Sequence, residues 1–505
     1  MKLNYKKTIF VGFAFFLICT FWQAYDTLIP KILTDKFGMP QTVSGIIMAL
    51  DNILALFLLP FFGALSDRHR GKRGKRTPFI VIGTLVAAIL LVSLSFADNA
   101  QLKNVEAVSK VDDPAALSTL YEESDALGVR FNESKEIDKK GKSIKELFTE
   151  EEFTAIRSDD KTGNYNAYVV PLRQAYAARA TKASPFPFIL FAIILLFTLV
   201  SMGVFRSPAV ALMPDVTPRP LRSKANAIIN LMGAVGGILV LGLGIVFGTG
   251  KPQNALMSYT TFFGIVAAIM VVCLMIFLWR VKEPKLVREM EEESRAFGIV
   301  ESDPEEGAES IAGKLSRNKL ISLLLILASV VLWFMGYNAV TSKYSVYAGS
   351  VLNLDYNATL IIAQAAAIIS YVPIGFISSR FGRKKTILAG ILMLGTAFLA
   401  ASFMRAGSSP LVMNILFALA GVGWATISVN SYPMVVELAS GGNVGKYTGF
   451  YYTASMAAQT ATPVLSGLLM DTVSMTALFP YATIFLALAF VTMFFVKHGE
   501  SKPAH

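Results

Sequence analysis

The chain has 505 residues and a mass of 54.8 kDa, with 54% hydrophobic residues, only 16% charged residues and a mean hydropathy of +0.54. Soluble domains carry roughly 25% charged residues, so this composition excludes a soluble enzyme. The net charge of +11 does not indicate nucleic-acid binding, because the basic residues cluster between apolar runs. Both cysteines, Cys19 and Cys273, lie inside such runs, which argues against a disulfide scaffold or a thiolate metal site.

Apolar runs recur along the chain, and each is long enough to cross a hydrocarbon core roughly 30 Å thick. The first run is too long for a signal peptide and lacks a cleavage site, so we expect it to be retained. The sequence predicts an all-α membrane protein with twelve spans, at residues 8–32, 42–65, 76–97, 186–213, 223–248, 256–280, 319–343, 355–378, 385–405, 410–436, 446–469 and 475–496.

The distribution of basic residues predicts how these spans are oriented. More than half of the 46 Lys and Arg fall in segments on one side of the predicted bundle, whereas the short loops on the other side carry few. Because basic loops stay in the cytoplasm, we expect a multi-pass protein of the cell membrane with both termini cytoplasmic. Two polar segments interrupt the spans, an extracytoplasmic one at 98–185 and a cytoplasmic linker at 281–318.

An internal repeat relates the first six spans to the last six. At an offset of 312 residues, Tyr25 matches Tyr337, Asp26 is replaced by Asn338, Gly63 matches Gly375 and Arg68 matches Arg380. At an offset of 222 residues, Asp215 is replaced by Glu437. The drop in offset corresponds to residues 98–185, which are therefore an insertion in the first half. We expect two six-helix halves, 1–280 and 319–505, that rock about a site near the membrane midplane.

The turn after the span at 42–65 reads Gly63-Ala-Leu-Ser-Asp67-Arg68, and a related turn follows the span at 355–378. These turns resemble the loop signature of the major facilitator superfamily. A glycine allows two helices to approach closely, and an aspartate can cap a helix end and pair with an arginine. The alternative is that the cations only follow the positive-inside rule. The gating residues that we predict are Gly63, Asp67, Arg68, Arg76, Asp215, Gly375, Arg380, Arg383 and Glu437.

Longer stretches are similar to the sugar/proton symporters of the glycoside-pentoside-hexuronide group, which includes sucrose carriers. They are residues 66–80, 207–215, 224–227, 431–433 and 445–452. The resemblance covers the twelve spans but not the insertion. It implies secondary transport of a sugar, of the di- or oligosaccharide class, inward together with protons.

The sequence departs from that group at two places. Val210 and Leu199 stand where plant sucrose carriers have an arginine and a carboxylate, although Arg206 lies one turn from Val210 on the same helical face. Ala55 and Leu59 stand where melibiose-type symporters have the carboxylates of a sodium site. The resemblance therefore does not carry over a sodium site, and Arg206 is a candidate for the missing arginine.

Three charged residues are candidates for proton coupling. Asp51 lies close to the middle of the span at 42–65, where a charged group costs roughly 2.5–3.5 kcal/mol on insertion scales. We expect Asp51 to carry the proton, with Arg206 as its partner and Asp26 as the second candidate. The alternatives are a structural ion pair for Asp51 and an interfacial position for Asp26.

The residues that we expect to contact substrate combine aromatic rings with hydrogen-bonding groups, which suits a carbohydrate. For the neutral amides the alternative is a hydrogen bond between helices. The predicted substrate-binding residues are Trp22, Gln23, Tyr25, Asp26, Asn52, Arg206, Asn230, Asn338, Gln364, Asn430 and Gln459.

The leading functional hypothesis is a monomeric, proton-coupled sugar importer that works by alternating access and needs no cofactor. A drug or metabolite/proton antiporter of the same fold is the alternative, and a membrane receptor that does not transport is a third hypothesis. The three histidines lie in loops or the tail, and the sequence contains no phosphate-binding loop, nucleophile motif or zinc motif, so nothing supports an enzyme.

Overall fold

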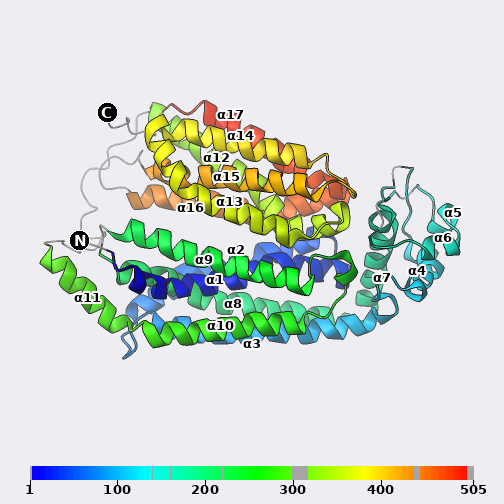
Figure 1. Cartoon of the computed structure of the whole chain (residues 1–505), viewed down its shortest axis with the longest axis horizontal. Helices are drawn as coiled ribbons and strands as arrows, with labels where there is room; N and C mark the ends of the chain where they lie inside the picture. Colours follow the sequence, from blue (N-terminus) through cyan, green and yellow to red (C-terminus); the bar gives the residue numbers. More distant parts are fainter. Residues whose placement is uncertain are drawn as a thin grey trace.

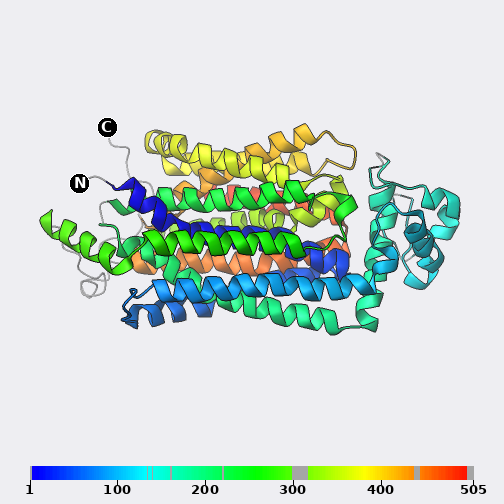
Figure 2. The same cartoon turned by 60° about the horizontal axis from the view of Figure 1, so that its bottom comes forward.

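The computed structural model describes residues 3–133, 135–138, 140–159, 162–218, 221–297, 317–436 and 444–497. Twelve long helices in this part of the chain run alongside one another in two groups, and a small helical unit projects from one end (Figures 1 and 2). The predicted all-α architecture with twelve spans is confirmed, and most span ends differ from the prediction by only a few residues.

The first half contains six of the long helices. They are α1 (Tyr5–Lys31), which continues into the π-helical turn η1 (Ile32–Lys36), α2 (Gln41–Arg68), α3 (Thr77–Asn104), α8 (Phe186–Asp215), α9 (Arg222–Phe247) and α10 (Thr260–Arg280). The second half contains α12 (Arg317–Tyr347) with the turn η6 (Ala348–Leu352), α13 (Tyr356–Phe381), α14 (Arg383–Ala401), α15 (Pro410–Val436), α16 (Val444–Thr472) and α17 (Leu478–Phe494).

Length and composition make ten of these helices able to cross a membrane, counting only described residues. The other two are α13, whose apolar stretch covers only Tyr356–Tyr371, and α16, which contains three Tyr and five Thr. Burial also differs between the spans, from 61% of the most apolar window in α1 to 22% in α2. The high burial of α1 is what we expect of a helix at the centre of a bundle.

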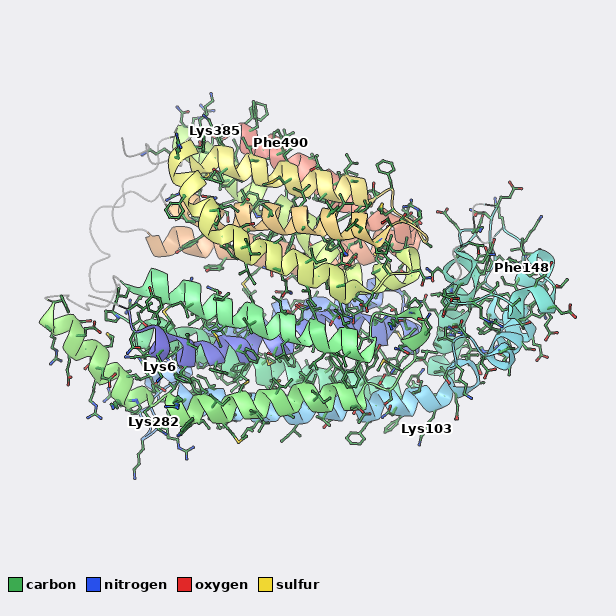
Figure 3. All side chains as sticks on the ribbon, viewed as in Figure 1. Lys6, Lys103, Phe148, Lys282, Lys385 and Phe490 are labelled. Atoms are coloured by element: carbon green, nitrogen blue, oxygen red, sulfur yellow. The ribbon has the colours of Figure 1, made fainter. Side chains whose placement is uncertain are left out.

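The two ends of the bundle differ in what they carry. We call the end where α1 begins and α17 ends the terminal face, and the opposite end the insertion face. The helix α11 (Glu283–Ala296) extends from the terminal face, where Lys6, Lys282 and Lys385 also lie (Figures 1 and 3). Residues 298–316 of the predicted linker lie outside the described residues.

The insertion at 98–185 forms a small helical unit with its own core. It contains η2 (Glu106–Val108), α4 (Pro114–Leu127), α5 (Ile144–Leu147), α6 (Glu150–Thr154), η3 (Tyr165–Val169) and α7 (Val170–Ala183). The side chains of Leu117, Phe131 and Phe153 are at most 1% exposed and pack together in this core. Each membrane half has a separate apolar core, so the chain builds three packed units.

The two halves are joined at the insertion face by the beginning of α2 and the end of α16. A β-carbon at Gly45 would meet the carbonyl of Pro463, and one at Gly467 would meet the carbonyl of Gln41, so both positions require glycine for this approach. Asp471 of α16 accepts hydrogen bonds from the backbone N–H of Gln41 at 2.8 Å and of Thr42 at 2.6 Å. The halves are thus closed against each other at this face.

Toward the terminal face, the ribbons of the two halves diverge (Figure 1). Large apolar side chains are exposed along this part of α2 and α13, among them Phe57 at 67% and Phe376 at 74%. The structure therefore has the halves hydrogen-bonded at the insertion face, while their ribbons spread apart toward the terminal face.

Candidate functional site

The central site begins with an aromatic patch on α1. The ring of Trp22 contacts Phe21 and Tyr25 edge to face, at centroid distances of 5.3 Å in both cases. The guanidinium of Arg206 from α8 lies over the Trp22 ring, 5.3 Å from its centroid. Trp22 Nε1 and the Tyr25 hydroxyl are buried without a hydrogen-bond partner among the described residues. The patch thus joins an aromatic surface to a cation and to two unused polar groups.

Two carboxylates lie near Arg206. Asp26 is exposed on α1, whereas its neighbours Tyr25 and Thr27 are buried. The Asp26 side chain therefore lies outside the surface through which α1 packs against other helices. The charges of Asp51 and Arg206 both act on Asp26. Asp51 accepts a hydrogen bond from the Asn52 amide at 2.8 Å, and among the described residues it forms no ion pair with Arg206. The predicted partners therefore share one electrostatic site, but the direct Asp51–Arg206 pair is not formed in this state.

The second half contributes an aromatic pair that sequence reasoning missed. The rings of Tyr337 from α12 and Trp424 from α15 stack with a centroid distance of 3.7 Å and an interplanar angle of 3°. Through the internal repeat, Tyr337 is the counterpart of Tyr25, so this pair corresponds in the second half to the aromatic patch on α1. The repeat offset matches Tyr337 to Tyr25, which was the available signal, but nothing in the sequence marked Trp424.

Two of the predicted amides, one from each half, are hydrogen-bonded to each other. The Gln364 amide of α13 donates to the side-chain carbonyl of Gln23 on α1 at 2.6 Å, which joins the halves directly. Nδ2 of Asn338, next to Tyr337, is buried without a hydrogen-bond partner in the described part of the chain. Gln23, Gln364 and Asn338 therefore belong to the central site.

Three other predicted substrate-binding amides bond within their own helices. Asn430 donates to the Thr426 carbonyl at 2.9 Å, Gln459 to the Ser455 carbonyl at 3.3 Å, and Asn230 to the Asn226 carbonyl at 2.8 Å. Asn430 is also 1% exposed. Bonds within one helix are neither substrate contacts nor the hydrogen bonds between helices that were the alternative, so the roles of these three amides stay predictions.

At the terminal face, Arg76 is the centre of the predicted gating cluster. Its Nε donates to Asp215 at 2.8 Å, and its terminal nitrogens contact Asp67, Ser66 and the Gly63 carbonyl. Arg76 is only 5% exposed. The side chain therefore ties the end of α2 and the end of α8 to the beginning of α3, all within the first half.

Glu283, at the start of α11, completes this cluster and was not predicted. Its carboxylate accepts from the backbone N–H groups of Lys75 at 2.8 Å, Arg76 at 2.9 Å and Thr77 at 2.8 Å, so it caps α3. The residue is 1% exposed. An acidic residue after a span has no distinctive pattern, and only the fold brings it to the first turn of α3.

The remaining gating predictions fare differently. Arg68 is exposed and makes no ion pair with a described residue, so Arg76 takes the role that we expected of Arg68. A β-carbon at Gly63 would lie 2.8 Å from Ser207 Oγ, as a close approach requires, whereas one at Gly375 would meet nothing within 4 Å. The close approach expected at Gly375 is therefore wrong for this state.

In the second half, Arg380 is exposed and its guanidinium lies over the Phe381 ring at 5.8 Å. Arg383 is partly buried at the first position of α14. Glu437 lies outside the described residues.

Two buried lysines near the insertion face were also missed. Lys36 and Asp98 form an ion pair at 2.6 Å with both side chains 0% exposed, and Lys36 also donates to the Met257 carbonyl at 2.6 Å. Lys343 of α12 is 0% exposed and donates to the Gln41 carbonyl of the other half at 2.7 Å. Both lysines fall near predicted span ends, where a basic residue looks like an interfacial one.

The model of the Major Facilitator Superfamily matches residues 11–105, 174–372 and 357–505, which is most of the chain and omits most of the insertion. The chain belongs to the major facilitator superfamily. It is accordingly a multi-pass membrane transporter and not an enzyme, as predicted.

Solved members of this superfamily have the same fold at low identity. The xylose transporter XylE from E. coli, in an inward open conformation, has a TM-score of 0.57 and 13% identity, covering 99% of this chain and 97% of that one. A D-xylose-proton symporter has a TM-score of 0.56 and 14% identity, covering 98% of this chain and 97% of that one. A bacterial homolog of the human lysosomal transporter Spinster has a TM-score of 0.56 and 13% identity, covering 98% of this chain and 95% of that one.

A curated superfamily relative matches by sequence over a short stretch. The uncharacterized symporter YjmB of Bacillus subtilis (strain 168) is 29% identical over 100 residues, which are 19% of this chain and 22% of that protein. The chain thus spans about a fifth of the length of this relative.

Proposed function

We propose that this protein imports a sugar of the di- or oligosaccharide class together with protons, by alternating access between its two halves. The observation that carries the proposal is the central site, where Asp26, Asp51 and Arg206 lie beside aromatic rings from both halves. Sugars bind to proteins through stacking of their apolar faces on aromatic rings and through hydrogen bonds from their hydroxyls.

The unused polar groups of the site support a ligand with many hydroxyls. Trp22 Nε1, the Tyr25 hydroxyl and Asn338 Nδ2 are buried and donate to no described residue. A buried donor without a partner costs about 1–3 kcal/mol, so a ligand that accepts from these groups gains from pairing with them. A lipophilic drug would leave them unpaired, which favours sugar over the drug antiporter.

Proton coupling is supported by the charges of the same site. Asp26 and Asp51 lie close enough for their charges to interact, and Arg206 acts on both. A second negative charge makes the first carboxylate easier to protonate, whereas an approaching arginine has the opposite effect. A movement of Arg206 during rocking would therefore bind and release a proton. Two structural neighbours are xylose transporters, and one of them is a D-xylose-proton symporter.

The orientation that we propose places the terminal face in the cytoplasm of a cell-membrane protein. Lys6, Lys282 and Lys385 lie at this face, consistent with the positive-inside rule (Figure 3). In this orientation the structure is an inward-facing state, with its halves closed on the extracytoplasmic side by Asp471 and Lys343.

Uptake into proteoliposomes tests the function. Labelled sucrose, a trisaccharide, a monosaccharide and a lipophilic cation are compared under an inward proton gradient, an inward sodium gradient and no gradient. We expect accumulation of a di- or trisaccharide that requires the proton gradient and is inhibited by a protonophore. Accumulation driven by sodium alone would refute proton coupling. Export of the cation would favour the antiporter, and sugar binding without uptake would favour a receptor.

A further inference from the structure

We propose that the insertion is an extracytoplasmic strap, which is fixed to the first half and holds the second half only while the insertion face is closed. This inference rests on the alternating access that we propose for the transporter. The strap must release the second half before substrate can enter from the insertion face, so it favours the inward-facing state.

The insertion is attached to the first half both covalently and by buried hydrogen bonds. It continues directly from α3 and leads directly into α8. The Gln101 amide donates to the Lys36 carbonyl at 2.9 Å and to the Thr181 hydroxyl at 2.8 Å, and Thr181 in turn donates to the Phe37 carbonyl at 3.0 Å. Gln101 is 0% exposed. These bonds lie in a packed surface, so the insertion moves with the first half.

The attachment to the second half is weaker and is spread over three loops. The Asn353 amide, after η6, donates to the Ser158 carbonyl of the insertion at 2.7 Å. The Ser474 hydroxyl, after α16, donates to Glu136 at 3.4 Å between exposed side chains. Ala406, between α14 and α15, lies 3.6 Å from where a β-carbon of Gly163 would be. Contacts of this kind can break and re-form during a transport cycle.

A small cavity marks the place that the strap covers. Its lining comes from all three units, with Asp35 of the first half, Tyr165 of the insertion, and Val346 and Ser350 of the second half. The insertion therefore forms part of the wall where the halves meet at the insertion face. The two halves can therefore open at the insertion face only if Tyr165 and the neighbouring residues of the insertion move away from the second half.

A reversible crosslink tests the proposal directly. Cysteines placed by Gly163→Cys and Ala406→Cys would have β-carbons about 3.6 Å apart, within the usual disulfide range of roughly 3.5–4.5 Å. Gly163 has a φ of 74°, where a side chain strains the backbone by roughly 1–2 kcal/mol, so the single variant Gly163→Cys must first be shown to fold and transport. The native Cys19 and Cys273 lie inside α1 and α10. We expect oxidation to abolish uptake and a reductant to restore it, while each single variant is insensitive to the oxidant. An oxidised, crosslinked double variant that transports at the same rate as the reduced double variant would overturn the proposal.

A second test weakens the strap instead of locking it, and needs neither sugar nor protons. Asn353 has a φ of 55°, so Asn353→Gly keeps the backbone conformation while removing the amide that holds Ser158. Labelling of a Ser350→Cys reporter by an impermeant maleimide measures opening of the covered cavity. We expect labelling to become roughly three- to tenfold faster with Asn353→Gly, as the loss of one such bond implies. The matched control Asn99→Ala, which removes an amide that donates to Thr260 within the first half, should not change the rate.

The two tests also separate this inference from the proposed function. If Asn353→Gly speeds labelling but no sugar is taken up, the proposed role of the insertion is supported and the proposed sugar substrate is refuted. If sugar uptake is seen but labelling does not change and the crosslink is harmless, the strap is refuted.

Discussion

The carboxylates at the centre of the bundle make a prediction that single substitutions can test. Asp51→Asn keeps the shape and hydrogen bonding of a protonated aspartate but cannot titrate. We expect proton-driven accumulation to fall to background, while exchange of labelled sugar at equal pH on both sides stays within about threefold of the unmodified protein. Both are measured in the same proteoliposomes.

Asp26→Asn is the comparison variant for this measurement, because the two charges interact in one site. If a stable Asp51→Asn protein still concentrates sugar and an Asp26→Asn protein does not, Asp26 and not Asp51 is the residue that carries the proton. Loss of exchange and of thermal stability together would identify Asp51 as a structural residue.

The stacked pair in the second half leads to a prediction about affinity. Trp424→Leu removes the ring that stacks on Tyr337 at 3.7 Å, and with it a planar surface beside the carboxylates. We expect the KM for sugar to rise about tenfold with little change in maximal rate, since an aromatic contact contributes roughly 0.5–1.5 kcal/mol beyond its buried area. The control Trp279→Leu alters an indole that is 67% exposed on α10 and should leave the KM unchanged. Equal effects of both substitutions would exclude a specific role for Trp424.

Residues of the central site differed in how visible they were in the sequence. Asp51 and Arg206 stood out because a charge in an apolar run is costly and needs a function. Trp424 did not, because a tryptophan in such a run is ordinary. Arg68 and Arg76 were both predicted as gating residues, but the turn places only Arg76 against Asp67 and Asp215, while Arg68 is exposed. Spacing along the chain cannot show which of two nearby arginines turns inward.

At the scale of single elements, the buried ion pair between η1 and α3 affects stability. Lys36→Met leaves the Asp98 carboxylate buried without its cation, which costs roughly 3–5 kcal/mol. We expect a clear loss of thermal stability in detergent, measured as the Tm of the purified protein. The double variant Lys36→Met with Asp98→Leu should recover most of that loss and still transport sugar. A double variant as unstable as the single one would show that the lysine's bond to Met257 matters more than the pair.

The Arg76 cluster predicts a difference between two neighbouring arginines. Arg76→Gln removes charged bonds to Asp67 and Asp215 and should lower the stability of the folded protein by about 2 kcal/mol. Arg68→Gln changes an exposed side chain and should stay within about 0.5 kcal/mol. Thermal unfolding of both variants in the same detergent measures the difference. Similar Tm values for the two variants would mean that Arg76 does not hold the three helix ends together.

Element boundaries were predictable where the apolar run itself ends the helix, as in α15, found at Pro410–Val436. They were not where polar residues are buried against another unit. The predicted span ended at residue 97, but α3 continues to Asn104 because Asp98 and Gln101 are buried against η1 and the insertion. For the same reason α12 passes Lys343, whose ammonium bonds to the other half.

At the scale of the whole molecule, we expect the closure at the insertion face to affect the balance between the inward-facing and outward-facing states. Asp471→Asn replaces a carboxylate that accepts three hydrogen bonds from Gln41 and Thr42. Bonds to a charged group contribute about 1.5–3 kcal/mol, so we expect at least a tenfold shift of the population toward the state open at the insertion face. Distances between spin labels on the second and first halves, measured across the insertion face, report that population.

The control for this experiment is Asp113→Asn, which alters a carboxylate that caps α4 inside the insertion. It should leave the distance distribution unchanged. If Asp471→Asn also leaves it unchanged, the α2–α16 contact does not determine the equilibrium, and the closure depends on other contacts of the interface.

The plan of the molecule was the most predictable part, since twelve apolar runs and the repeat offsets define two six-helix halves without any contact being known. The state of the molecule was not predictable, because the same sequence must satisfy at least two arrangements of its halves. The fold of the insertion was also beyond the sequence patterns, since its short helices and its core around Phe131 and Phe153 follow no repeat.

The compact insertion also gives this transporter a landmark outside the membrane. Here a folded unit projects from one end and is joined to the first half by α3 and by the buried bonds of Gln101 (Figure 2). An antibody fragment raised against α4 or α6 would therefore report the position of one half without touching the central site.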